Sequence, residues 1–213
     1  MEKREFGIQN YPLKKTKANF NVKKMKNNIE KSFLDSAECI KKSVNLSEMV
    51  EKAIKEIINC LERGNKIIIF GNGGSAADAQ HIAAEFISKF KKNRKSLPAI
   101  ALTTDTSILT SIGNDFSFDH IFSRQCEALV SEGDVVLGIS TSGNSVNVKN
   151  GITTSMEKKA KTIALLGNNG GIIKECVDIP IIVEDSSTSS IQEVHRVIYH
   201  IICEFVETEL TKK

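Results

Sequence analysis

Short apolar runs alternate with segments of helical periodicity along most of the chain. The run at 67–70 holds consecutive apolar residues with no polar alternation, which is typical of a strand buried on both faces of a parallel sheet. Further strands are predicted at 98–103, 135–139, 162–166 and 178–183. Strands that alternate with helices predict an α/β fold with a five-stranded parallel sheet, whose ligands lie at the carboxyl ends of the strands.

Helical spacing of apolar residues also precedes the first strand. One helix is predicted to begin at Asn28, and a second is predicted to begin with Ser47 as its cap and to end at Gly64. Residues 1–27 are rich in Lys and Asn and show little periodicity, so they are predicted to form a basic, loosely ordered extension. The remainder, 28–213, is predicted to be a single domain.

The sequence pattern is weaker for the helices that follow the first strands. Helices are predicted at 106–112 and 119–130 and after Ser145, and the basic stretch 89–96 is predicted to be a solvated turn. The segment 189–210 carries apolar residues at three- and four-residue spacing. It is therefore predicted to be a long C-terminal helix.

Composition narrows the possible classes of protein. A length of 213 residues, with 40% hydrophobic and 26% charged residues, suits one globular domain. The net charge of +3 is small and its charges are interleaved, so no nucleic-acid partner is expected. No run approaches the roughly 20 apolar residues of a membrane span, and the first residues lack the apolar core of a signal peptide. A cytoplasmic location without membrane association is expected, with the five widely spaced cysteines reduced.

A glycine-rich turn, GNGGSAADAQH, follows the first predicted strand. Gly71, Gly73 and Gly74 allow the backbone to turn sharply. Ser75, followed three residues later by Asp78, has the pattern of a capping box and predicts the start of a helix. A strand, a glycine turn and a helix N-terminus together favour the binding of an anion, above all phosphate.

The helix after this turn carries His81 and Glu85 four residues apart. Residues with that spacing lie one above the other on a single helix face. An imidazole and a carboxylate that converge suit a divalent metal, or a base held beside a polarising group. A solvated helix face is the alternative that the pair alone leaves open.

A second polar turn follows the strand predicted at 135–139. Ser140, Thr141, Ser142 and Ser145 supply four hydroxyl groups, which together with backbone donors can surround a phosphate without Lys or Arg. An ordinary loop rich in serine and threonine is equally consistent with this local pattern.

Two nucleotide-binding motifs can be compared with the first turn. A dinucleotide site requires an acidic residue at the end of the second strand, about 20 residues on, but Asp105 comes later and Glu85 lies within a helix. The chain also has no G-K-[ST] sequence of a P-loop. Two turns suited to phosphate beside a His/Glu helix therefore favour a sugar-phosphate site.

Several motifs, in the same order, resemble the phosphoheptose isomerase branch of the SIS (sugar isomerase) domain family. They are GNGGSAADAQH, ALTTDTS with IGND, FSRQ, GDVVLGISTSGNS, and IQEVH with a later His, and they span about 28–210. The resemblance implies an SIS-type three-layer sandwich, a homotetramer with active sites between subunits, and a Zn²⁺ ion. It also implies conversion of sedoheptulose 7-phosphate to D-glycero-D-manno-heptose 7-phosphate through an enediol, an early step toward the heptose of surface polysaccharide.

The same resemblance implies roles for individual residues. The substrate-binding residues that it implies are Asn72, Gly73, Gly74, Ser75, Glu85, Asn114, Asp115, Ser140, Thr141, Ser142, Ser145 and Gln192. The metal ligands that it implies are His81, Glu85, Gln192 and His200, with Glu85 as catalytic base and His200 as catalytic acid.

Two features of the chain affect which of the roles implied by the resemblance apply to its residues. Ser189, Ser190 and Lys89 stand where many relatives have other polar or charged residues. Gln192 and His200 are eight residues apart, about 12 Å along a straight helix. If one metal ion binds both residues, this spacing predicts that the site is shared between subunits or that the helix is bent.

Two other functions are considered. The SIS family includes a non-catalytic tetrameric protein that binds the bacterial replication initiator, but that branch lacks the carboxylate and the terminal histidine that this chain has at Glu85 and His200. The other is isomerisation of a different sugar phosphate, because neither chain length nor stereochemistry of the substrate can be read from these motifs.

Overall fold

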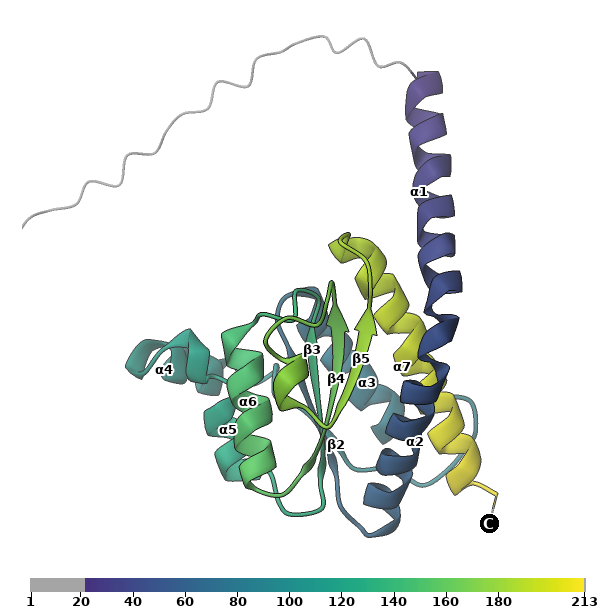
Figure 1. Cartoon of the computed structure of the whole chain (residues 1–213). Helices are drawn as coiled ribbons and strands as arrows, with labels where there is room; N and C mark the ends of the chain where they lie inside the picture. The colour runs from purple at the N-terminus through teal and green to yellow at the C-terminus, as the bar shows by residue number, and fades with distance from the viewer. Residues whose placement is uncertain (1–21, 213) are drawn as a thin grey trace, which may run out of the picture. The chain divides into compact units, whose positions relative to one another are not determined.

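Five parallel strands form one sheet in the order β2-β1-β3-β4-β5 (Figure 1). In this computed structural model, which describes residues 22–212, the strands are β1 Ile67–Gly71, β2 Ala99–Ala101, β3 Val135–Ser140, β4 Lys161–Gly167 and β5 Ile179–Val183. Every neighbouring pair is parallel, so the predicted five-stranded parallel sheet is confirmed. Only β2 is much shorter than predicted; it is an edge strand, and its Ile100 is 37% exposed.

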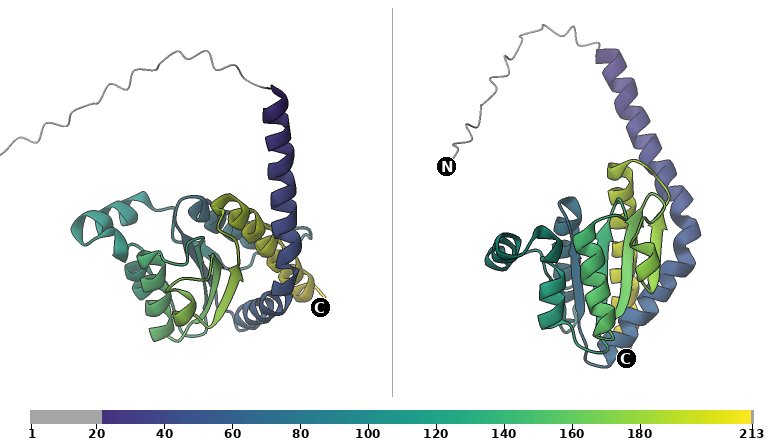
Figure 2. Two further views of the ribbon diagram at one scale, coloured as in Figure 1. Left: turned by 45° about the horizontal axis from the view of Figure 1, so that its top comes forward. Right: turned by 60° about the vertical axis from the view of Figure 1, so that its left-hand side comes forward.

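Helices cover both faces of the sheet (Figure 2). Helices α2 (Ser47–Glu62), α3 (Gly74–Ile87) and α7 (Thr188–Leu210) lie on one face, and α5 (Ser123–Leu129) and α6 (Val146–Glu157) lie on the other. Successive residues of a strand point to opposite faces, so Ile67 and Ile69 join one buried cluster while Ile68 and Phe70 join the second. The predicted three-layer sandwich is confirmed.

Helix α1 (Val22–Lys42) begins before its predicted start at Asn28. Its first residues contain no Gly or Pro and are mainly Lys and Met, which are good helix formers even without an apolar stripe. The chain divides after Leu34 into two units, of which the second contains the sheet. Residues 1–21 of the predicted extension lie outside the described residues.

Local details of four other helices differ from prediction. Ser47 is the first residue of α2 rather than its cap, and its Oγ donates to Val44 O at 2.6 Å. Helix α4 (Thr106–Asp115) extends beyond the predicted 106–112, and the predicted helix at 119–130 is divided into η2 (Phe118–His120) and α5. Short 3-10 helices η1 (Ser43–Leu46) and η3 (Lys174–Cys176) complete the fold. Within the described range, no helix is long and apolar enough to cross a bilayer.

The basic stretch 89–96 is largely exposed, as predicted, but it is also anchored to α7. The Glu207 carboxylate, 2% exposed, accepts hydrogen bonds from the backbone N–H groups of residues 90–92 at 2.7 to 2.9 Å. Arg94 donates its Nε–H to the same carboxylate at 2.9 Å, and its side chain is 6% exposed. The buried Glu207 carboxylate on α7 therefore fixes the backbone of this lysine-rich segment.

Candidate active site

The strand order places the two polar turns next to each other. β1 has β2 on one side and β3 on the other, so the direction of chain progression reverses between β1 and β3, and ligands bind at such a crevice at the carboxyl ends. Asn72, after β1, and Asn147, near the start of α6, exchange two amide hydrogen bonds of 2.8 and 3.0 Å. This reciprocal pair joins the turns, and it uses the Asn72 amide that the sequence assigned to substrate.

The serine hydroxyls of the second turn converge. Ser140 Oγ lies 3.0 Å from Ser145 Oγ and 3.4 Å from Ser142 Oγ. Ser145 is the residue before α6 and makes no side-chain cap. Val148 N–H donates to Asn147 Oδ1 at 2.9 Å, which leaves the earlier amides of the helix for another acceptor. Gly143 has φ +66°, and a Cβ there would overlap the backbone of Gly170. The turn thus presents hydroxyls and helix amides, which is the chemistry of an anion site.

The first turn begins α3 in a different way from the prediction. Gly73, at φ 56°, precedes the helix and no side chain caps it, so the capping box predicted for Ser75 and Asp78 is wrong. The Asp78 carboxylate instead accepts from Arg196 Nη2 at 3.2 Å and from the Tyr199 hydroxyl at 3.3 Å. The long-range contact with α7 occupies the side chain that a capping box would have used locally.

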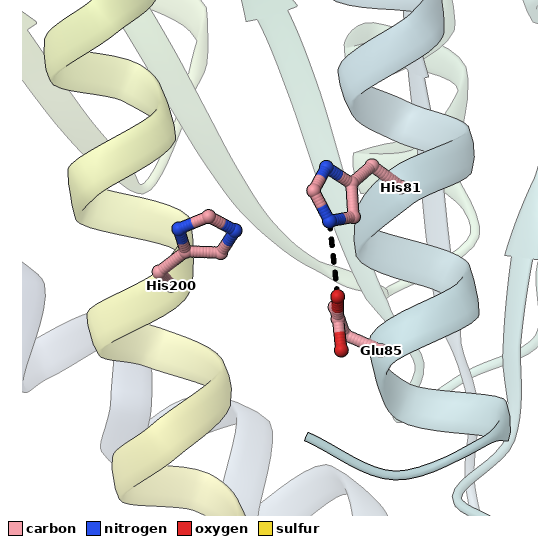
Figure 3. A group of neighbouring side chains, drawn as sticks. All are labelled: His81, Glu85 and His200. Atoms are coloured by element: carbon pink, nitrogen blue, oxygen red, sulfur yellow. Dashed lines mark hydrogen bonds and ion pairs between the residues drawn. The ribbon is translucent and has the colours of Figure 1, made fainter. Parts of the chain in front are cut away.

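His81, Glu85 and His200 come together in one chain (Figure 3). His81 Nε2 lies 2.9 Å from Glu85 Oε1, and one candidate ligand atom from each of the three residues falls within 4.8 Å of the others. Partial burial, and then the neighbouring His81, lower the pKa of His200, so its imidazole is neutral over a wider pH range. Two imidazoles and one carboxylate are donors that suit a divalent metal.

Helices α3 and α7 lie side by side and run in the same direction, as their successive contacts show. These contacts join Gly74 to Gln192, Asp78 to Arg196, and His81 to Tyr199. A Cβ at Gly74 would lie 2.5 Å from Gln192 Nε2, so Gln192 lies at the glycine turn. His81 lies about 10 Å further along α3 than Gly74.

Gln192 and His200 lie in different surroundings on α7. Helix α7 runs from Thr188 to Leu210 without interruption. His81, Glu85 and His200 converge without a second subunit, whereas Gln192 contacts the glycine turn. Metal binding by Gln192 remains a prediction.

Asn114 and Asp115 lie at the end of α4 and not beside this cluster. Asn114 Nδ2 donates to Asp115 Oδ1 at 2.8 Å, and both residues are exposed. Helix α4 packs on η2, toward the α5 and α6 side of the sheet, while α7 covers the opposite face (Figures 1 and 2). A single chain therefore leaves these two predicted substrate contacts away from Glu85.

Two residues beside the site, Tyr199 and Phe90, were not predicted from the sequence. Tyr199 is fully buried and its hydroxyl lies 3.1 Å from His81 Nδ1; burial and the charge of Asp78 raise its pKa to about 12. The Phe90 ring lies 5.7 Å from the His200 ring. A tyrosine directly before the predicted ligand His200 was the available signal.

His195, the other histidine of α7, belongs to the core. It is fully buried, its Nε2 lies 3.1 Å from Leu166 O, and burial lowers its pKa to about 4. It is a neutral link between α7 and β4.

Comparison with known proteins shows the family of the chain. The SIS domain model matches residues 32–167. The phosphoheptose isomerase of Citrifermentans bemidjiense is 55% identical over 168 residues, 79% of this chain and 88% of that protein, and that of Aliarcobacter butzleri is 50% identical over 88% of this chain and 100% of that protein. The structure of a phosphoheptose isomerase from Neisseria gonorrhoeae, 40% identical, superposes with a TM-score of 0.83 over 86% of this chain and 99% of that one. The chain therefore belongs to the phosphoheptose isomerases, a branch of the SIS domain family.

Proposed function

We propose that the protein converts sedoheptulose 7-phosphate to D-glycero-D-manno-heptose 7-phosphate. The observation that carries the proposal is the convergence of His200, on α7, with His81 and Glu85, which lie on a helix that starts at a phosphate-type turn. A base and an acid beside an anion site are what aldose–ketose isomerisation of a sugar phosphate requires. The same two residues argue against the non-catalytic SIS function.

The proposed chemistry is a pair of proton transfers. The Glu85 carboxylate removes a proton from C1 of the ketose, and His200 delivers a proton to the carbonyl oxygen at C2, which gives the enediol. Glu85, whose proton exchanges with solvent at this stage, then protonates C2 while the C1 hydroxyl gives its proton back to His200, which yields the aldose. His81 Nε2 lies 2.9 Å from Oε1 of this carboxylate.

A zinc site is proposed at the same cluster. His81, Glu85 and His200 would hold the ion, since three protein ligands with one open position are typical of catalytic zinc. When bound, zinc would polarise the sugar oxygen at which negative charge develops. Gln192 is proposed to contact the substrate from the glycine turn, next to Gly73, Gly74 and Ser75.

The hydroxyls of Ser140, Ser142 and Ser145, with Thr141, are proposed to bind the phosphate. Ser140→Ala is expected to raise KM by about 10- to 150-fold, because a hydrogen bond to a charged group contributes about 1.5–3 kcal/mol, and to change kcat little. Steady-state kinetics would test this, with Ser131→Ala, a serine outside the turn, as control. An unchanged KM would remove the turn from phosphate binding.

A homotetramer is proposed to complete the site, with Asn114 and Asp115 reaching the substrate of another copy. An apolar groove of about 360 Å³ supports an interface between copies. It lies between the end of α1, α2 and α7, and its lining includes Ile40, Val44, Ile201 and Phe205, which are 36 to 70% exposed in the single chain.

Ile201→Asp is expected to break the assembly, because an unpaired carboxylate in an apolar interface costs several kcal/mol. Its mass should fall below four times 23.5 kDa and its activity should be lost, while zinc remains bound because the three ligands come from one chain. Light scattering, zinc analysis and activity would be measured together. Met156→Asp, at an exposed position on α6, is the control. A fully active monomer would contradict the proposal.

A cytoplasmic location is also proposed. The described chain has five free cysteines, four of them buried, which suits a reducing compartment. The product would enter synthesis of the heptose of surface polysaccharide.

The direct test is an isomerase assay of the purified, zinc-loaded protein with sedoheptulose 7-phosphate and a panel of pentose and hexose phosphates. The proposal predicts the highest kcat/KM for sedoheptulose 7-phosphate. A higher value for another sugar phosphate would change the substrate, and no turnover of any of them would favour the binding function.

A further inference from the structure

One buried hydroxyl lies directly behind the histidine of the candidate metal site. The Tyr199 hydroxyl is 3.2 Å from Arg196 Nε, 3.3 Å from Asp78 Oδ1 and 3.1 Å from His81 Nδ1. Tyr199 is fully buried and Asp78 is 2% exposed. The contacts connect a buried acid to the face of His81 that points away from Glu85.

The donors and acceptors around this hydroxyl can be counted. The Arg196 guanidinium can only donate, and the Asp78 carboxylate can only accept. The hydroxyl has one proton and two lone pairs, so it receives the arginine N–H on one lone pair and gives its proton to Asp78. The second lone pair is left for the neighbouring His81 Nδ1, which must then be a donor.

We infer that Tyr199 is a positioning residue that keeps the ring proton of His81 on Nδ1, so that Nε2 offers its lone pair to a metal ion. The inference rests on the metal site of the proposed function. In the opposite arrangement the hydroxyl donates to Nδ1, and the buried Asp78 loses one of its two hydrogen-bond donors, which is unfavourable for a buried acceptor.

The other ring nitrogen of His81, Nε2, faces the Glu85 carboxylate. An unprotonated Nε2 faces Glu85 Oε1 at 2.9 Å, and two acceptors at that distance require a cation between or beside them. A metal ion held by both residues supplies it. The hydrogen bond at Nδ1 thus orients a ligand for its ion, as groups behind metal-bound histidines generally do.

The test uses Tyr199→Phe, which removes the hydroxyl and keeps the ring. Zinc affinity would be measured by chelator competition, and the variant is expected to bind about 10- to 100-fold more weakly than the wild type. Thr162→Val is the matched control: it removes another buried hydroxyl that donates to an aspartate, here Asp178 at 2.8 Å, at the opposite end of the strands. Its zinc affinity should equal that of the wild type.

A second readout locates the ring proton directly. Nitrogen-15 NMR of histidine-labelled, metal-free Glu85→Gln, assigned with His81→Gln, reports which ring nitrogen of neutral His81 carries the proton; the amide introduced at position 85 can either donate to Nε2 or accept from it, so it favours neither position. The inference predicts Nδ1–H in this variant and a loss of that preference when Tyr199→Phe is added.

The outcomes separate the inference from the proposed function. Protonation on Nε2 in metal-free Glu85→Gln, or unchanged zinc affinity in Tyr199→Phe, would overturn the inference and leave the metal site intact. A wild type that binds no zinc would overturn the metal site, and the NMR measurement would still decide the position of the proton.

Discussion

Glu85→Gln is expected to lower kcat by about 10²- to 10⁴-fold, the usual contribution of a positioned general base. Glutamine keeps the size of the side chain, and its amide N–H can donate a hydrogen bond to His81 Nε2, but it cannot take up a proton from C1. The fold should be unchanged, because the amide occupies the same volume as the carboxylate in this partly buried position. Steady-state kinetics and a melting curve would be measured on the same preparation.

The control for this prediction is Glu204→Gln. Glu204 lies on α7, is 42% exposed, and pairs with Lys91 at 2.7 Å, so its loss should leave kcat within error of the wild type. The double variant Glu85→Gln with His200→Gln should lose little more than Glu85→Gln alone, because residues that act in one step are not additive. Near-normal kcat in Glu85→Gln would exclude Glu85 as the base.

Glu207→Ala is expected to lower the free energy of unfolding by about 3–5 kcal/mol, as happens when one partner of a buried ion pair is removed. The variant leaves Arg94, whose side chain is 6% exposed, without its carboxylate. It also leaves three amides at 90–92 without their acceptor. Denaturant unfolding would measure the loss.

Glu209→Ala, an exposed glutamate on the same helix that pairs with Lys212, is the control and should change stability little. Burial alone would raise the pKa of Glu207, but the three amides and Arg94 hold it below its usual value. Its stabilisation is therefore complete above about pH 4.3, the ordinary pKa of glutamate, and is lost as the pH falls through the lower folded value. A Glu207→Ala protein as stable as the control at neutral pH would contradict this account.

The parts of the fold that depend on local pattern were predictable. Runs such as 67–70 and 135–139 are apolar without alternation, and only a doubly covered parallel strand suits them. The His81 and Glu85 pair was also predictable, because a spacing of four residues on one helix determines that both side chains share a face.

The contacts between helices far apart in sequence were not predictable in this way. Asp78 reads locally as part of a capping box, but it contacts Arg196 and Tyr199, more than a hundred residues later. Arg94 and Glu207 look like ordinary surface charges, yet they are buried together. Local propensity does not report which side chains a neighbouring helix will cover.

Deuterium incorporation tests the central claim, proton transfer by Glu85 through an enediol, most directly. Zinc-loaded wild type would be incubated with sedoheptulose 7-phosphate in deuterium oxide until the two sugars reach equilibrium, and both would be analysed by NMR. The account predicts deuterium at C2 of the aldose and C1 of the ketose, with none introduced by Glu85→Gln over the same period. Equilibrated sugars without deuterium would indicate a hydride shift and would contradict the account.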